Sequence, residues 1–209
     1  AAVLNYLLLL GWAPEGEQEI FSLDEMIKIW DPSRISKSPA IFDPLKLRAI
    51  NAAYIRALPA EEFRKLADPF IDQAVHVQID RDLLCANLQP RCEVLEDIPP
   101  QLDFFDAVLP IDAEMYRNKK QKTTPESAKE ALTALLPVLE AQTDWTRDAI
   151  FEACKTLAEQ MEKKNGWLLF PLGIALSGKA RTPGGGTDLA AMMGKEETIV
   201  RVKAALEKL

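Results

Sequence analysis

One stretch of this sequence places positive charge beside an unusually free backbone. Residues 172–197 read LGIALSGKARTPGGGTDLAAMMGKEE, in which a helical segment is followed by a basic arm, three glycines and a new helix start. Glycines 184–186 have no side chain, so they can take positive φ and let another surface approach the main chain. Lys179 and Arg181 add positive charge at that opening. The chemistry available here is recognition, although a plain helix connector is the favoured interpretation of this stretch alone.

Arg91 is a second candidate for recognition. It follows Pro90 at a predicted helix end, where its guanidinium projects from a fixed backbone. Arginine is suited to bidentate hydrogen bonds with base edges or phosphates. The alternative interpretation is a surface salt bridge with Glu93 or Glu96, which would contribute little stability.

Common enzymatic chemistry is hard to build from these residues. The sequence has one histidine, His76, and lacks G-x-S-x-G, HExxH and a phosphate-binding loop in which Gly-Lys-Ser/Thr follows a strand. Most hydrolase, metalloprotease and nucleotide-binding functions are therefore excluded. Cys85, Cys92 and Cys154 contain no CxxC pair, so neither a metal site nor a disulfide framework is expected, and the cytoplasm is the natural compartment.

Composition indicates a soluble globular protein with few general contacts to nucleic acid. Of the 209 residues, 48% are hydrophobic and 27% charged, with a formal net charge of -7. Phosphate binding needs clustered Lys and Arg. One short run, residues 117–122, contains four cations, and we interpret it as a solvated loop first and a backbone-contacting patch second.

The apolar opening of the sequence is expected to be neither a signal peptide nor a membrane span. The apolar opening AAVLNYLLLLGW has no basic n-region and is too short to cross a bilayer. The sequence also starts without Met, which we interpret as a fragment that begins inside a larger protein.

The elements that must position these residues are helices. Period-two alternation is absent and apolar residues recur with the helical period, which predicts an all-α chain of about ten helices in small packed units. The predicted helical segments are 1–10, 23–30, 44–58, 60–70, 80–88, 92–105 with a break at 99–100, 125–141, 145–164, 167–177, 188–193 and 195–209.

Several of these helix starts carry capping signals. Ser22 and Glu25 form a predicted capping box, whereas Thr124 is a predicted N-cap followed by Pro125 at the first helical position. Asp144 is the predicted cap of the segment 145–164. The four tryptophans are expected in the core, with base stacking by Trp167 as the alternative for that residue.

Two joints divide the chain into helical units. One lies between Leu58 and Pro59, and the other is the polar run 118–124. They predict an N-terminal piece at 1–58, a middle domain at 59–122 and a C-terminal domain at 123–209.

Several stretches taken together resemble one protein family, the bacterial glutamyl-tRNA synthetases (glutamate–tRNA ligases), over their C-terminal half. The stretches follow the family's order along almost the whole chain, and they are LNYLLLLGW at 4–12, EIFSLDEMI at 19–27, RISKSPAIFDPLKLRAINAAYIR at 34–56, DWT at 144–146 and PLGIALSGKARTPGGGTDLAAMMGKEET at 171–198. The resemblance implies that 1–58 ends a stem-contact region, and that 59–122 and 123–209 are two helical anticodon-binding domains with a helix-bundle architecture.

The resemblance also implies where catalysis would take place. In this family a class I Rossmann domain activates glutamate with ATP and Mg²⁺, and that domain would precede Ala1. We therefore expect no catalytic residue, metal or cofactor in this fragment, which would be inactive alone. The RISKSP run at 34–39 echoes an ATP-binding signature but belongs to the stem-contact region. The expected partner is tRNA-Glu, bound by a cytoplasmic monomer without affinity for membranes or DNA.

Carried over position by position, the resemblance assigns an anticodon site. Arg91, in QPRCEVLEDIP, matches the arginine by which discriminating members read the third anticodon base. The pocket for the first two bases would be lined by the loop residues Ser177, Gly178, Thr182, Pro183, Gly184 and Gly185. In such a loop main-chain groups read base edges.

This sequence departs from the family at Gly173, where PLR-x-AL is common. Lys179 or Arg181 is expected to compensate for the missing guanidinium, and Trp167 or Phe170 to stack on a base. Two other functions stay open. One is an all-α protein-interaction module that binds no RNA, and the other is a paralogue that is directed to tRNA-Gln or does not discriminate.

Overall fold

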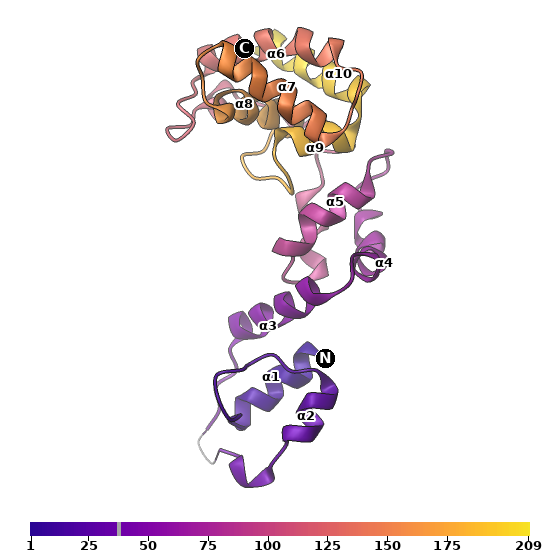
Figure 1. The fold of residues 1–209 in the computed structure, drawn as a ribbon, viewed down its shortest axis with the longest axis vertical. Coiled ribbons are helices and arrows are strands. Elements are labelled where there is room, and N and C mark those ends of the chain that lie inside the picture. Colours follow the sequence, from indigo (N-terminus) through magenta and orange to yellow (C-terminus); the bar gives the residue numbers. More distant parts are fainter. Residues whose placement is uncertain (37–38) are drawn as a thin grey trace.

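Three helical bodies follow one another along an elongated molecule (Figure 1). The structure is a computed structural model that describes residues 1–36 and 39–209. Over these residues it contains ten α-helices and five short 3₁₀ helices, and the described chain has no strand beyond two isolated bridges. The all-α prediction is confirmed. None of the described helices is long and apolar enough to cross a membrane.

The N-terminal body is organised by buried Asn5. It contains α1 (Ala2–Gly11), α2 (Leu23–Ile29) and the first part of α3 (Pro44–Ala57). The Asn5 side-chain nitrogen donates to the Glu19 carbonyl at 2.7 Å. The side-chain oxygen accepts from the Phe21 backbone amide at 2.8 Å and from the Tyr54 hydroxyl at 2.9 Å. One polar side chain thus joins α1 to the start of α2 and to α3, because a buried amide must satisfy its hydrogen bonds.

Local capping signals in this body are confirmed, but burial was overestimated. Ser22 and Glu25 form the capping box. Helix α1 buries three residues, and Leu7 is 52% exposed. Trp30 is 47% exposed, so the prediction that all four tryptophans are core is wrong. Lys37 and Ser38, within the RISKSP run, lie outside the described residues.

The middle body is built from α4 (Ala60–Ile71), α5 (Arg81–Leu88) and short 3₁₀ turns. Asp80, the first residue of the predicted segment 80–88, is the N-cap of α5, and its carboxylate accepts from the Leu83 amide at 2.9 Å. The segment 92–105 forms 3₁₀ turns at Leu95–Asp97 and Pro99–Gln101 instead of two α-helical pieces. Consecutive prolines remove two backbone donors there, so a longer α-helical ladder cannot form.

The C-terminal body packs four helices around a fifth. These are α6 (Pro125–Ala141), α7 (Arg147–Gln160), α8 (Asn165–Ser177), α9 (Gly186–Met193) and α10 (Lys195–Lys208). Helix α8 contacts each of the other four. It is apolar on all sides and is buried along most of its length, as a central helix must be.

Three helix starts in this body differ from the sequence predictions, and one of them is α9, which begins at Gly186, two residues before the predicted Asp188. Thr146 is the N-cap of α7, with its hydroxyl accepting from the Ala149 amide at 3.3 Å, so the helix begins two residues later than the predicted Trp145. Asp144 instead accepts from the Thr146 amide at 3.2 Å. Helix α8 already begins at Asn165, because a glycine near an N-terminus does not prevent helix formation.

One contiguous hydrophobic cluster runs from Ile55 to Ala205 and fills both the middle and C-terminal bodies. A separate small cluster of Ala2, Tyr6 and Ile50 serves the N-terminal body. Because the middle and C-terminal bodies share apolar contacts, their helices fix one another's positions. The boundaries proposed at 58/59 and 122/123 stay predictions.

Arg201 connects segments that are far apart in the sequence. Its side chain is 2% exposed, yet each of the three guanidinium nitrogens donates at least one hydrogen bond. It donates to the carbonyls of Phe104 at 2.6 Å, Leu176 at 2.7 Å and Phe105 at 2.7 Å, and to the Glu197 carboxylate at 2.6 Å. Arg201 thereby ties α10 to the last turn of α8 and to the end of the middle body.

We expect Arg201→Met to lower the free energy of unfolding by about 3–5 kcal/mol, because it leaves three buried carbonyls and a carboxylate without their donor. Denaturant unfolding measures the loss. Lys203→Met is the matched control, since Lys203 forms an exposed pair with Glu140 and should cost under about 1 kcal/mol. Equal losses in the two variants would contradict the role given to Arg201.

The three cysteines should react slowly in the native protein. All are free and buried, and burial raises the pKa of Cys85 and Cys92 to about 11 and that of Cys154 to about 12. Below these values the thiols stay protonated and are poor nucleophiles. At about pH 8 a thiol-specific disulfide reagent should modify them promptly only after denaturation. Fast reaction of any one in the native state would refute this burial.

Candidate nucleic-acid interface

The loop between α8 and α9, residues 178–185, is held firmly where it leaves α8. Gly178 takes φ +66, a left-handed conformation that favours glycine, and its amide donates to the Ile174 carbonyl at 2.8 Å. The Ser177 hydroxyl donates to the Gly173 carbonyl at 2.7 Å and accepts from the Lys179 amide at 3.0 Å. From this cap the loop extends away from α8 and α9 toward α5 (Figure 1).

The other end of the loop is held by Asp188, in the first turn of α9. Its carboxylate accepts from the Gly185 amide at 2.7 Å. Glycines 184–186 could take positive φ, but none of them does. Gly186 is needed for a close approach instead, because a Cβ there would lie 2.7 Å from the Leu169 carbonyl oxygen and 3.0 Å from the Gly173 nitrogen.

Arg91 meets this loop from the middle body. It ends the 3₁₀ turn Gln89–Arg91 that follows α5, and its Nη1 lies 3.4 Å from the Thr182 carbonyl oxygen, 91 positions along the chain. The alternative salt bridge to Glu93 is not formed; Glu93 pairs with Arg48 at 2.8 Å. The structure therefore brings together the two features that the sequence had singled out separately.

A cavity of about 410 Å³ opens beside the loop. Four predicted site residues line it: Lys179, Thr182, Gly184 and Gly185. The remainder of the lining is Gln121, Arg147, Phe151, Gly166, Leu169, Phe170, Gly173, Ile174, Ala180, Gly186, Thr187 and Asp188. Aromatic rings, glycine backbone and a few charged groups converge here, as is typical of binding sites for small planar groups.

Other predicted site residues do not reach the cavity. Trp167 is 6% exposed, with the Lys163 ammonium 5.2 Å from its ring centroid, which agrees with its expected place in the core; stacking on a base stays a prediction. Its ring fills the core, whereas Phe170 lines the cavity. Ser177, Gly178 and Pro183 are buried, and Arg181 is exposed outside the cavity.

The two cations of the loop differ in whether they already have partners within the protein. Lys179 donates to the Pro100 carbonyl at 2.9 Å and pairs with Asp103, which anchors the loop to the middle body. Arg181 is exposed, and no ion pair of its guanidinium is found among the described residues. Compensation for Gly173 by either residue stays a prediction.

Sequence analysis missed Arg147 and Gln121, both of which line the cavity. Arg147 starts α7, bonds Asp148 at 2.7 Å and Asp188 at 3.2 Å, and these hydrogen bonds raise its pKa. Its guanidinium also lies 5.5 Å from the Phe151 ring centroid. The only available signal was the position of Arg147 directly after a Thr cap, which indicates a helix start but no ligand.

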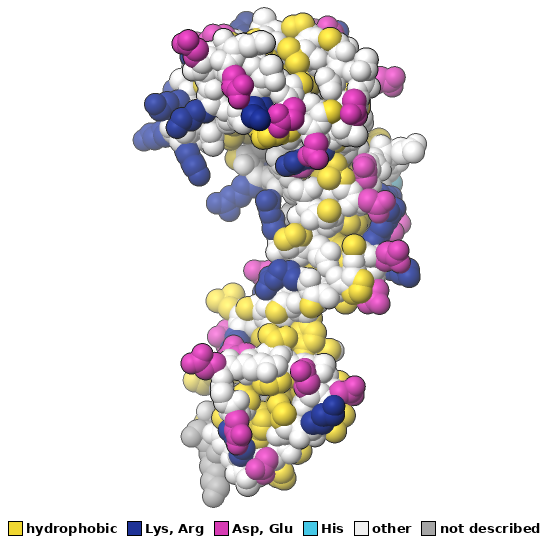
Figure 2. All heavy atoms as spheres, viewed as in Figure 1, with side chains coloured by type: hydrophobic (Ala, Val, Ile, Leu, Met, Phe, Trp, Pro, Cys, Tyr) yellow, Lys and Arg dark blue, Asp and Glu magenta, His cyan; other side chains and the backbone are white. Residues whose placement is uncertain are grey.

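Positive side chains gather on the edge of the molecule that carries these features. Figure 2 shows Lys and Arg side chains from the loop beside α8 down to the level of α5, with hardly any Asp or Glu between them in this view. The opposite edge mixes both signs. The acidic average of the chain thus hides a local basic surface.

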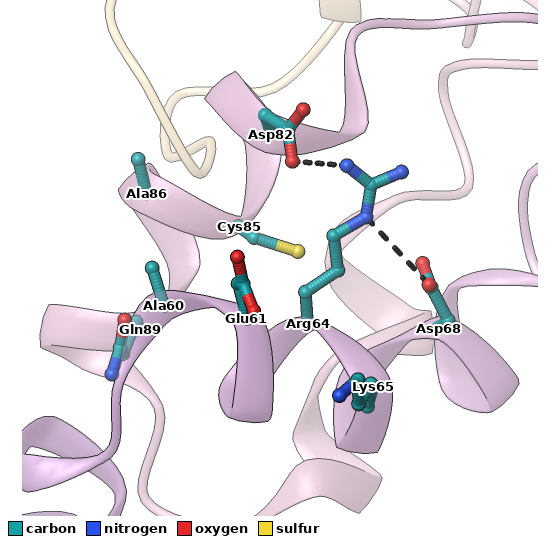
Figure 3. Close-up of a pocket in the computed structure, with 9 residues that line it drawn as sticks. All are labelled: Ala60, Glu61, Arg64, Lys65, Asp68, Asp82, Cys85, Ala86 and Gln89. Atoms are coloured by element: carbon teal, nitrogen blue, oxygen red, sulfur yellow. Dashed lines mark hydrogen bonds and ion pairs between the residues drawn. The ribbon is translucent and has the colours of Figure 1, made fainter.

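A larger cavity, of about 600 Å³, lies between α4 and α5 but has unsuitable chemistry for an anion (Figure 3). Its main cation, Arg64, is paired with Asp82 and, at 3.7 Å, with Asp68. The Cys85 thiol faces it in its protonated form. In the described part of the chain no group of three or more His, Cys, Asp and Glu is placed to hold a metal ion.

Comparison with known proteins defines the class. A family model described as an anticodon binding domain matches residues 51–206, and the chain belongs to that family. The match includes Arg91, the whole loop and every residue that lines the cavity beside it.

The matching relatives are glutamate–tRNA ligases, which confirms the resemblance drawn from the sequence. The protein of Clostridium botulinum (strain Hall) is 45% identical over 208 residues, covering 100% of this chain and 43% of the relative. That of Clostridium acetobutylicum is 44% identical over 209 residues, with the same coverage. The chain thus spans well under half the length of the curated relatives it matches.

Two solved structures of the same kind of ligase have a fold similar to that of this chain. A glutamate tRNA ligase from Elizabethkingia meningosepticum, crystallised in complex with its amino acid, matches with a TM-score of 0.85 at 29% identity, covering 100% of this chain and 41% of that one. The glutamate-tRNA synthetase of Elizabethkingia anophelis matches with a TM-score of 0.81 at 27% identity, covering 99% and 40%.

We expect Gly186→Ala to destabilise the protein by about 1–3 kcal/mol, because the new methyl would overlap the Leu169 carbonyl where α8 and α9 touch. Thermal unfolding measures the change. Gly11→Ala is the control, since no atom lies within 4 Å of a Cβ there. Wild-type stability of Gly186→Ala would mean that the helices do not touch at this point.

Proposed function

We propose that this chain is the tRNA-binding, anticodon-recognising C-terminal portion of a glutamate–tRNA ligase. The observation that carries the proposal is the approach of Arg91 to the Thr182 carbonyl beside a glycine-walled cavity. Membership of the anticodon binding domain family supports it.

In this proposal Arg91 and the cavity recognise different bases. A guanidinium can donate two parallel hydrogen bonds to one base edge, which suits Arg91 to the third anticodon base. The first two bases occupy the cavity, where Phe170 offers a stacking face and the loop offers main-chain donors and acceptors. Gly185, which is exposed and has no side chain, lets a base approach the backbone closely.

The activity belongs to the full-length parent. Its catalytic part attaches glutamate to tRNA-Glu with ATP and Mg²⁺, while the present chain holds the anticodon. A cytoplasmic location and a monomeric state are part of the same proposal. Because the chain is acidic, we expect binding by this chain alone to be weak and to fall as salt rises.

Arg91→Gln should reduce discrimination at the third anticodon base by about 1–3 kcal/mol while leaving the unfolding temperature unchanged. Binding of the purified chain to tRNA-Glu and to a version changed at that base measures the discrimination. Arg64→Gln, on α4 and outside the 410 Å³ cavity beside the loop, is the matched control. Equal affinity of the wild-type chain for the two tRNAs would refute the role of Arg91.

The two alternatives give different results in the same experiment. A paralogue directed to tRNA-Gln would bind that tRNA better than tRNA-Glu, and a non-discriminating one would bind both equally. An all-α interaction module would shift neither tRNA, and its binding to a partner protein would be insensitive to salt.

A further inference from the structure

A compact basic turn lies beside the cavity, and base recognition does not use its charges. It spans residues 117–122, between the 3₁₀ helix η5 (Ala113–Tyr116) and α6. Asn118 and Thr123 close it with two backbone hydrogen bonds of 3.0 Å, and the Asn118 side chain accepts from the amides of Lys120 and Gln121. The turn therefore holds its lysines on a fixed backbone.

Three of its four cations are free to meet a ligand. Arg117 is occupied by the Glu114 carboxylate, through bonds of 2.7 and 2.9 Å. Lys119, Lys120 and Lys122 are exposed, and within residues 1–36 and 39–209 no carboxylate pairs with their ammonium groups. Three unpaired cations on one rigid turn make an anion-binding surface.

The turn is joined to the cavity through Gln121. The side-chain oxygen of Gln121 occupies the space that a Cβ on residue 166 would fill, so Gly166 permits this approach, and both residues line the cavity. Gly166 belongs to the first turn of α8, which Lys164 precedes and which has no side-chain cap. A helix N-terminus of this kind adds to the attraction for anions.

We propose that Lys119, Lys120 and Lys122, together with Lys164, form a rim that binds the backbone phosphates of the nucleotides adjoining the bases in the cavity. The inference rests on the proposed function and extends it from the bases to the path of the RNA strand. Phosphate contacts set the register of a nucleic acid, whereas base contacts specify it. The rim therefore supplies affinity and positioning, and the cavity with Arg91 supplies selectivity.

The arrangement favours RNA over an acidic protein as the occupant. The rim is continuous with a cavity that has the aromatic and glycine lining suited to unstacked bases, and a strand that inserts bases there must carry its phosphates past the rim. Figure 2 shows the basic edge continuing from the side of α8 toward α5, and Arg91 ends the 3₁₀ turn that directly follows α5.

The test replaces Lys119, Lys120 and Lys122 with alanine in the 209-residue chain. Binding to tRNA-Glu is measured between about 50 and about 200 mM salt, and we expect affinity at the lower salt to fall on the order of tenfold. The slope of log K against log salt should become shallower by about 2, at about 0.7 for each phosphate that a lysine no longer neutralises. The ratio of affinities for tRNA-Glu and the third-base variant should stay at its wild-type value.

The matched control replaces Lys28, Lys65 and Lys129 with alanine, which changes the net charge equally at exposed lysines on α2, α4 and α6. This control should keep nearly the wild-type slope. An unchanged slope in the rim variant, or equal losses of affinity in both triple variants, would overturn the proposal. Equal rim-dependent binding of poly-glutamate would overturn it too and assign the surface to an acidic protein.

The two proposals fail separately in this experiment. If the wild-type chain does not discriminate the anticodon variants but the rim variant still loses salt dependence, the anticodon assignment falls and the phosphate surface stands. If discrimination is present and the rim variant binds like wild type, the anticodon assignment stands and the rim does not bind phosphate.

Discussion

The arrangement of the middle and C-terminal bodies depends on the hydrogen bonds of the buried Arg201 guanidinium. This guanidinium is a positive charge removed from water, which is stable only because three carbonyls and one carboxylate surround it. Two of those carbonyls, on Phe104 and Phe105, belong to the end of the middle body. The third, on Leu176, belongs to the last turn of α8, two residues before the glycine-rich loop begins. The loop therefore starts from a point whose position relative to the middle body is fixed.

From that point the candidate site follows by short steps. Gly178 turns the chain out of α8, Lys179 anchors it to Pro100 and Asp103, and Asp188 fixes its return into α9. These constraints bring the Thr182 carbonyl to Arg91 and leave Gly185 exposed at the cavity. Recognition by main-chain groups requires such a fixed loop, because a mobile one would lose conformational entropy on binding.

The charge distribution explains how an acidic chain can hold an acidic ligand. Most Asp and Glu side chains lie at helix starts or form ion pairs with neighbouring cations, as Glu93 and Asp97 do with Arg48. The cations of the basic edge have few such partners. Since screening limits each charge to about 10 Å at moderate salt, a nearby phosphate responds to this edge far more than to the net charge.

Helix positions were predictable wherever a cap and a periodic apolar pattern agreed within one turn. The starts at Ser22, Asp80 and Thr124 are examples. The prediction failed where two caps competed, as at Asp144 and Thr146. It failed also for the burial of Trp30, which is 47% exposed although all four tryptophans were expected in the core. Which face of a helix is covered depends on partners elsewhere in the chain, and a local pattern does not name them.

The sequence by itself determined the helical class, the capped ends of most helices, the free cysteines and, through its ordered motifs, the family. Only the tertiary structure decided that Trp167 is core, that Arg147 and Gln121 line the cavity, and that Arg201 joins the two bodies. The physical reason is range. Caps and periodicity act within a few residues, whereas burial and buried hydrogen bonds join groups such as Arg91 and Thr182 that only the completed fold brings together.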